Sequence, residues 1–190
     1  FKELGLPYYE GFGEAAFYGP KIDIQLRNVL GKEETVSTVQ VDRHLPKQFG
    51  LEYIGEDGAT HQPVMIHRGV ISTMERMVAF LIEHYAGVFP TWLAPVQALV
   101  LPIADRHKEY AQSVADTLKA QGFRVDVDAR NEKVGKKIAE AETQKIPYML
   151  VVGDRDAAAG NVSVRRHGGQ DGGSLSIEDF AAKLREETAS

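Results

Sequence analysis

The residues that could do chemistry gather in "HRGVISTMERMVAFLIEHYAG", residues 67–87, which has the periodicity of an apolar helix and yet contains an arginine. Residues three and four apart share a helix face, so a helix that reaches back far enough aligns three small residues with this arginine. They are Gly69, Ser72, Thr73 and Arg76. A trough of small residues that ends in a guanidinium could admit a planar or anionic group. The alternative is a surface arginine paired with Glu75 or another acid.

Three further side chains could take part in a site. His67 ends the predicted strand "PVMIH" and could bind a metal ion, although a lone histidine is more often structural and a catalytic zinc site needs about three protein ligands. Tyr18 and Lys21 flank a Gly-Pro turn, where they could bind a carboxylate or a phosphate. Turn chemistry alone also explains this Gly-Pro pair. The sequence contains no nucleophile elbow, Walker loop, dinucleotide fingerprint or HExxH helix.

Composition limits the class of protein. The chain has 190 residues, 43% of them hydrophobic, and it contains no cysteine, which excludes disulfides and thiolate metal ligands within it. No apolar run reaches the ~18 residues of a membrane span and no secretory signal is visible, so a cytoplasmic protein without membrane contact is expected. The opening "FKELGLPYYE" resembles a helix interior and predicts a piece of a longer protein.

Charge gives one local signal. The net charge of −5 argues against a protein whose main task is nonspecific phosphate binding. Four cations nevertheless fall between residues 130 and 137, opposed within that stretch only by Glu132. They are Arg130, Lys133, Lys136 and Lys137. The cluster is either a solvated helix face or a contact surface for RNA.

Two kinds of pattern divide the chain. The first part alternates as antiparallel strands do, and an apolar helix follows that a glycine at position 87 should end. Its predicted strands are 21–29, 37–45, a short strand before the Asp57-Gly58 turn and 63–67, and its helix spans about 72–87. The segment "FPTWLAP", residues 89–95, is predicted to be a linker.

After the linker, strands alternate with helices, which predicts a mostly parallel sheet with crossover helices. The predicted strands are 96–103, 123–129, 147–153 and 161–166, and the helices are 105–120, 132–144 and 177–187. The Gly-rich stretch "RRHGGQDGGSL", residues 165–175, is predicted to be a surface loop.

With these residues laid out, the chain resembles the threonyl-tRNA synthetases, which are class II aminoacyl-tRNA synthetases, along essentially its whole length. The resemblance rests on "AAFYGPKIDIQ", "STVQVD", "LEYIGEDG", "HQPVMIHRGVISTMERMVAFLIEHYAG", "FPTWLAPVQ", "DARNEK" and "KIPYMLVVGDRD". It implies an α/β protein in which residues 1–92 are the C-terminal part of a class II catalytic domain, with an antiparallel sheet and motif 3. Residues 93–190 would form a mixed-sheet α/β anticodon-binding domain.

The resemblance also implies roles for single residues. Arg76 matches the motif 3 arginine, which in this class holds the terminal phosphate of ATP and packs on adenine, and His67 matches one ligand of a zinc ion that grips threonine. Lys21 is expected to take part in catalysis beside Arg76. The residues expected around threonine and the adenylate are Tyr18, Gln40, Ser72 and Thr73. Those expected to read anticodon bases are Asn131, Lys133, Asp156 and Arg165.

The implied reaction is that of a threonine–tRNA ligase, in which threonine is activated with ATP and Mg²⁺ and then transferred to tRNA(Thr) by a homodimeric full-length enzyme. The other zinc ligands and motifs 1 and 2 are absent from these residues, so the chain alone is expected to be inactive. Departures from the family pattern stand at Thr35, Arg43 and Lys145. Two alternatives stay open, a stand-alone RNA-binding module without catalysis and a small ATP-binding α/β enzyme unrelated to tRNA.

Overall fold

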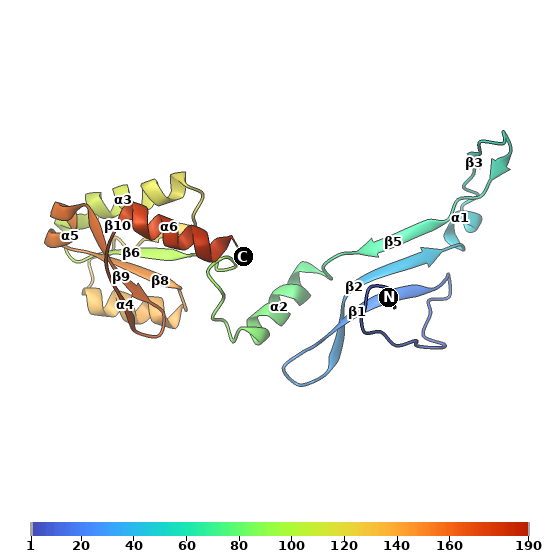
Figure 1. Cartoon of the computed structure of the whole chain (residues 1–190), viewed down its shortest axis with the longest axis horizontal. Coiled ribbons are helices and arrows are strands. Elements are labelled where there is room, and N and C mark those ends of the chain that lie inside the picture. Colours follow the sequence, from blue (N-terminus) through green and yellow to red (C-terminus); the bar gives the residue numbers. More distant parts are fainter. Residues whose placement is uncertain (1, 190) are drawn as a thin grey trace. The chain divides into compact units, whose positions relative to one another are not determined.

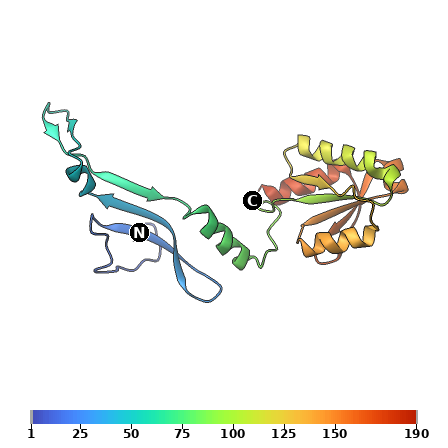
Figure 2. The same cartoon turned by 180° about the vertical axis from the view of Figure 1, so that it is seen from behind.

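The computed structural model of the chain describes residues 2–189, which form two compact units (Figure 1). Unit 1 ends at His84 and unit 2 begins at Tyr85. Each unit combines strands with helices, as the same ribbon seen from behind also shows (Figure 2). Across residues 2–189, no helix has both the length and the apolar character that a membrane crossing would require.

Unit 1 contains an antiparallel sheet in the order β1-β2-β5, formed by β1 (Lys21–Arg27), β2 (Glu33–Asp42) and β5 (Met65–Gly69). A second, two-stranded ladder pairs β3 (Tyr53–Ile54) with β4 (Thr60–His61). Its helices are the short α1 (Leu45–Gln48) and α2 (Met74–His84). The antiparallel character predicted for this part of the chain is therefore confirmed.

The β1–β2 turn is held by an asparagine. The side-chain Oδ1 of Asn28 accepts hydrogen bonds from the backbone N–H groups of Leu30 and Lys32, both at 3.0 Å. Gly31 completes the turn with a φ of +77°, a left-handed conformation that glycine adopts without steric cost. This turn fixes the register of the two strands and thereby decides which side chains lie opposite one another.

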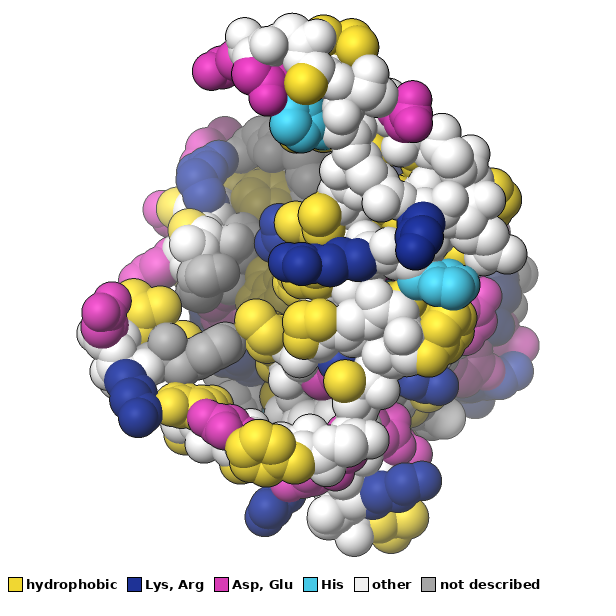
Figure 3. Space-filling model, turned by 90° about the vertical axis from the view of Figure 1, so that its right-hand side faces the viewer, with side chains coloured by type: hydrophobic (Ala, Val, Ile, Leu, Met, Phe, Trp, Pro, Cys, Tyr) yellow, Lys and Arg dark blue, Asp and Glu magenta, His cyan; other side chains and the backbone are white. Residues whose placement is uncertain are grey.

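Unit 1 leaves most of its apolar surface open. Val36 is the one buried hydrophobic residue in its described strands, and none of the described residues of α2 is buried. Hydrophobic side chains therefore lie at the surface between charged ones (Figure 3). The exposed hydrophobic residues of β1, β5 and the segment that follows β5 include Ile22, Ile24, Ile66, Val70, Ile71 and Met74. In a folded domain, the apolar face of a sheet is normally covered by a second layer of helices or strands.

Unit 2 is built on a mixed sheet in the order β10-β9-β8-β6-β7. β6 (Ala98–Pro102) pairs in parallel with β7 (Val125–Val127) and β8 (Tyr148–Val152), whereas β9 (Asn161–Arg166) and β10 (Gln170–Ser176) are antiparallel. Its other elements are η1 (Asp105–His107), α3 (Lys108–Ala120), α4 (Val134–Thr143), α5 (Asp154–Ala159) and α6 (Ile177–Thr188). The predicted mixed sheet with flanking helices is confirmed.

Two apolar layers make unit 2 a complete core. On one face, α3 and α6 pack over strand residues such as Val100 and Leu150. On the other face, Ala141 of α4 and the following Ile146 pack against Leu101 and Met149. Figure 1 shows these helices on opposite sides of the sheet. Because both faces are covered, the central strands are continuous apolar runs, as parallel strands usually are.

One sequence prediction about local structure is wrong, and one helix was not predicted. The Gly-rich stretch 165–175 is not a loop, because Gln170–Ser176 pairs with β9 as strand β10. Gly173 takes a φ of +76° next to the register shift in that ladder, so the glycines allow an irregular strand. Helix α5 was also not expected, because its six residues are too few to show a helical period.

Candidate functional site

Three of the predicted site residues lie side by side on neighbouring strands of unit 1. Gln40 is the register partner of Lys21 on one side and of His67 on the other. Side chains of directly opposed residues in antiparallel strands point to the same face of the sheet. Lys21, Gln40 and His67 therefore form one row across β1, β2 and β5, although they are separated by up to 46 positions in the sequence.

Tyr18 joins this row from the turn before β1. Its hydroxyl donates a hydrogen bond to Oε1 of Gln40, and its ring meets the His67 ring edge-to-face with centroids 5.8 Å apart. Gly19 permits this approach, since a Cβ built there would lie 2.0 Å from the carbonyl oxygen of Val41. The Gly-Pro turn is thus needed to bring Tyr18 to the sheet.

Lys21 is held by its neighbours on the same face. Its ammonium forms an ion pair with Asp23, whose other oxygen accepts a hydrogen bond from the Thr38 hydroxyl at 2.7 Å. The hydrogen bond to Asp23 raises the pKa of Lys21. Burial works to raise the pKa of Asp23, but the hydrogen bonds from Lys21 and Thr38 outweigh it and the pKa lies below its ordinary value. Lys21 is therefore fixed at the β1 edge of the row by an ion pair that offsets its positive charge.

His67 has a partner that sequence reasoning missed. Its Nε2 lies 2.8 Å from Oδ2 of Asp42, a carboxylate with no exposed surface. The other oxygen accepts the backbone N–H groups of His44 and Leu45. Burial alone would raise the pKa of Asp42, yet the hydrogen bonds from His67, Leu45 and His44 hold it below its ordinary value. The signal available in the sequence was an aspartate at a strand position two residues after Gln40.

The trough expected on the helix does not exist as predicted. Gly69 ends β5, Ser72 lies in the connection after β5 with a φ of +30°, and α2 begins only at Met74. The N–H of Ser72 donates to the carbonyl of Val36 at 2.6 Å, which keeps this segment on the sheet instead of in the helix. Gly69 and Ser72 therefore share no helix face with Arg76.

Thr73 and Arg76 open the helix together. The Thr73 hydroxyl accepts the backbone N–H of Arg76 at 3.3 Å, as a helix-capping residue does. Within residues 2–189 the Arg76 side chain forms no ion pair, so the alternative of a surface arginine paired with Glu75 or another acid is not found. Its guanidinium is exposed and available to an anion.

Two of the three departures from the family pattern, Thr35 and Lys145, form hydrogen bonds through their side chains, whereas Arg43 forms one through its backbone that does not depend on the residue type. Thr35 exchanges hydrogen bonds with its register partner Gln25, and the backbone N–H of Arg43 donates to the carbonyl of Tyr18 at 3.2 Å. The ammonium of Lys145 donates to the carbonyl of Ala86 within unit 2.

The second group of predicted site residues gathers on the α4 side of unit 2. Met149 packs with the α4 cluster, and Arg165 is its register partner on β9, so Arg165 points to the α4 side of the sheet. Ser163, two residues earlier on the same face, donates to Oδ1 of Asp156 at 2.8 Å. The remaining Asp156 oxygen accepts the N–H of Gly153 at 3.0 Å.

Asn131 and Lys133 precede α4 at the same side of the sheet, with Lys133 at the N-cap position. The segment is fastened by a buried lysine, since Lys137 donates to the carbonyls of Pro102 and Asp128 at 3.2 and 2.9 Å. A buried ammonium that bridges the ends of β6 and β7 fixes the start of the segment that presents Asn131. All four residues expected to contact RNA thus lie on one side of unit 2.

The cationic cluster at this helix is largely neutralised. Arg130 pairs with Asp128 and Glu140 at 2.6 and 2.5 Å, Lys136 pairs with Glu132, and Lys137 is buried. The hydrogen bonds that the Arg130 guanidinium donates to the Asp128 carboxylate are the main reason that the pKa of Asp128 lies below its ordinary value. Among the described residues, Lys133 is the one member of the cluster that is both exposed and without an ion pair, so the chain carries less free positive charge here than the sequence suggested.

Two family patterns match the chain. Residues 1–85 match the "tRNA synthetase class II core domain (G, H, P, S and T)", and residues 97–187 match the "Anticodon binding domain". The chain belongs to the class II tRNA synthetases. In this synthetase chain the row of Lys21, Gln40 and His67 lies in the part that matches the core domain, and Arg165 lies in the part that matches the anticodon-binding domain.

Similar whole proteins are threonine–tRNA ligases. Those of Geobacillus sp. (strain WCH70) and Geobacillus kaustophilus are 61% and 60% identical over 186 residues, which is 97% of this chain. That stretch is only 29% and 28% of the two ligases, so this synthetase chain spans less than a third of their length. A crystal structure titled as the RNA binding domain of threonyl-tRNA synthetase from Cryptosporidium parvum Iowa II has a TM-score of 0.84 at 35% identity. The match covers 98% of this chain and 47% of that one.

The donor set allows a limited test of the zinc expectation for this synthetase. Among the residues that the structure describes, no three His, Cys, Asp or Glu side chains lie close enough together to hold a metal ion. His67 fits the place of a single ligand, because one ring nitrogen is held by a buried carboxylate and its side chain is 38% exposed. Metal-binding histidines are commonly held in this way. Any further ligands would come from outside these residues.

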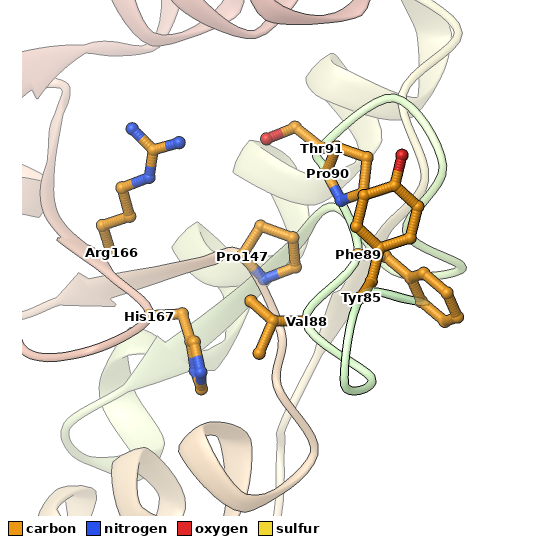
Figure 4. Close-up of a pocket in the computed structure, with 8 residues that line it drawn as sticks. All are labelled: Tyr85, Val88, Phe89, Pro90, Thr91, Pro147, Arg166 and His167. Carbon is orange, nitrogen blue, oxygen red and sulfur yellow. The ribbon is translucent and has the colours of Figure 1, made fainter. Parts of the chain in front are cut away.

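A cavity of about 230 Å³ lies elsewhere in unit 2 (Figure 4). Its lining combines the start of the unit with the ends of β8 and β9, and it contains none of the predicted site residues. It is lined by Tyr85, Val88, Phe89, Pro90, Thr91, Pro147, Arg166 and His167. Beside it Glu187 of α6 accepts hydrogen bonds from Thr91 and Tyr148 at 2.7 and 2.6 Å, which fastens the predicted linker segment to unit 2.

Proposed function

We propose that the chain is the C-terminal part of a threonine–tRNA ligase, which activates threonine with ATP and transfers it to tRNA(Thr). The observation that carries this proposal is the row of Lys21, Gln40 and His67, completed by Tyr18, on one face of the core-domain sheet. Ligases at 56–61% identity over almost the whole chain support the choice of threonine.

Activation requires charge placement more than covalent help. The threonine carboxylate attacks the α-phosphate of ATP and pyrophosphate leaves, so negative charge builds on phosphate oxygens. Arg76, exposed and without an ion pair among the described residues, would hold the terminal phosphate, and Lys21 would lie beside the adenylate. Ser72 and Thr73 are proposed to contact ATP next to Arg76.

Recognition of threonine would fall to the rest of the row. Gln40 and Tyr18 are already hydrogen-bonded to each other, so they present one fixed polar surface to the substrate. His67 is proposed as one ligand of a zinc ion, and Mg²⁺ would accompany ATP. When bound, the zinc ion would supply a Lewis-acidic position for the amino and hydroxyl groups of threonine. Only an amino acid with a hydroxyl group could fill that position. This matters because a methyl-sized pocket alone separates amino acids of the same shape by only about ten- to two-hundredfold.

Unit 2 is proposed to read the anticodon. Asn131, Lys133, Asp156 and Arg165 lie on one side of it, and the pairing of Asp156 with Ser163 orients a carboxylate that can accept from a base amine. We place the boundary between the catalytic and anticodon-binding domains at residues 92 and 93. The protein would act in the cytoplasm.

The open apolar faces of unit 1 indicate that more polypeptide is needed for catalysis. Ile22 and Ile66, on the sheet face opposite the row, are 49% and 64% exposed. We propose that the remainder of a full-length homodimeric ligase covers them and supplies the missing part of the active site. The completeness of the unit 2 core favours one alternative, a stand-alone RNA-binding module without catalysis.

Threonine-dependent exchange between ATP and pyrophosphate tests the proposal. The chain would be assayed alone and after joining to the remaining part of the Geobacillus sp. ligase, in place of its 61% identical segment. We expect no exchange from the chain alone and clear exchange from the joined protein, with Arg76→Ala of the joined protein as the inactive control. Exchange by the chain alone would contradict the need for more polypeptide. An inactive joined protein that still binds tRNA would favour the RNA-binding module.

A further inference from the structure

Asp42 is the buried acid of unit 1, and each of its oxygens has a defined partner. Oδ1 accepts the backbone N–H groups of His44 and Leu45 at 2.8 and 2.9 Å, and Oδ2 lies 2.8 Å from Nε2 of His67. An ionised carboxylate can only accept hydrogen bonds, so the hydrogen between Asp42 and His67 must belong to Nε2. In the neutral ring, the lone pair is then on Nδ1.

The imidazole ring that carries the free nitrogen is partly exposed. The His67 side chain is 38% exposed, and among residues 2–189 no hydrogen-bond partner is found for Nδ1. Asp42 itself cannot turn away easily, because the two N–H groups at the start of α1 hold its other oxygen. The tautomer of His67 is thus set by the backbone geometry around residue 42.

We propose that Asp42 is the positioning residue that reserves Nδ1 of His67 for a divalent metal ion. A carboxylate behind a ligating imidazole fixes the ring orientation, selects the tautomer and raises the basicity of the ligating nitrogen. This inference rests on the proposed zinc-binding role of His67. It gives Asp42 a function of its own, in addition to the roles proposed for Lys21, Gln40 and His67.

The chain provides its own matched control. Asp57 also contacts a histidine, with both carboxylate oxygens 2.9 Å from Nε2 of His61, and it accepts the N–H of Ala59 as well. The difference is burial, since the side chain of Asp57 is 59% exposed. Asp57→Asn therefore makes the same chemical change at an Asp–His pair that has no place in the row.

The tautomer itself can be measured in the 190-residue chain. The ¹⁵N shifts of the His67 ring, recorded as the pH is raised until they no longer change, should show hydrogen on Nε2. Asp42→Asn keeps an oxygen for the two backbone donors but turns an amide N–H₂ toward His67, so the hydrogen should move to Nδ1. Asp57→Asn should leave the His67 shifts unchanged. Hydrogen on Nδ1 in the unaltered chain would overturn the inference.

Metal affinity gives a second readout that does not depend on activity. In the joined ligase described above, Asp42→Asn should weaken Zn²⁺ binding about 10- to 100-fold in a chelator competition, the usual effect of removing such a partner. Asp57→Asn should not change it. Equal affinity in Asp42→Asn would overturn the inference. A joined ligase that holds no zinc while His67 shows the expected tautomer would instead refute the zinc-binding role of His67.

Discussion

Lys133→Gln should weaken RNA binding by removing the exposed, unpaired cation of the α4 cluster. One phosphate contact contributes about 0.7–0.9 to the slope of log K against log salt. At ~0.1 M salt that slope corresponds to about a five- to eightfold change in Kd, or roughly 1 kcal/mol. Lys136→Gln is the matched control, since Lys136 already pairs with Glu132 at 2.7 Å and has less charge to offer.

The assay is a titration of the chain with the anticodon stem-loop of tRNA(Thr) at several salt concentrations. We expect the slope to fall by about one unit in Lys133→Gln and to stay unchanged in Lys136→Gln. Equal slopes for Lys133→Gln and the unaltered chain would refute the assignment of Lys133 as a contact. Equal losses in both variants would show that ion pairing does not decide which cation meets RNA.

Three further predictions concern the stability of unit 2. Burial favours a higher pKa for Glu187, but hydrogen bonds from Thr91 and Tyr148 hold its pKa below the ordinary value. Stability should therefore be full above about pH 4.3 and fall as the pH drops through the lower folded pKa. Thermal melts should show a smaller acid loss in Glu187→Gln, and an equal loss would contradict this. Gly160 ends α5 with a φ of +69°, so Gly160→Ala should cost about 1 kcal/mol in urea unfolding, whereas Gly135→Ala within α4 should gain about 0.5–1 kcal/mol; the same sign for both would refute the backbone argument. Phe180 is fully buried with its ring edge-to-face with Tyr148 at 5.4 Å, so Phe180→Ala should cost about 3–5 kcal/mol, and a loss under ~1 kcal/mol would contradict the packing.

Much of the fold was predictable because its signals are local. The alternation of Ile22 and Ile24 marks β1, and the apolar run from Tyr148 to Val152 marks a strand covered on both faces. Strand β10 was missed because its glycines suggest a loop, and only pairing with β9 makes it a strand. That information lies in a neighbouring segment and not in the composition of residues 170–176.

The site was predictable by resemblance but not by pattern. Nothing local places Lys21, Gln40 and His67 in one row, because that row depends on the register of three strands. The argument that placed Gly69, Ser72 and Arg76 on one helix face assumed a longer helix. It is wrong because Ser72 is hydrogen-bonded to the sheet and lies outside the helix. Asp42 was missed because its burial depends on the turn that leads into α1.

The most direct test of the account is the binding of the chain to the anticodon stem-loop of tRNA(Thr), compared with the same stem-loop carrying exchanged anticodon bases. We predict clear preference for the tRNA(Thr) sequence and loss of that preference in Arg165→Ala, with each good base contact worth about 1–3 kcal/mol. Equal affinity for both stem-loops in the unaltered chain would contradict the claim that unit 2 reads an anticodon.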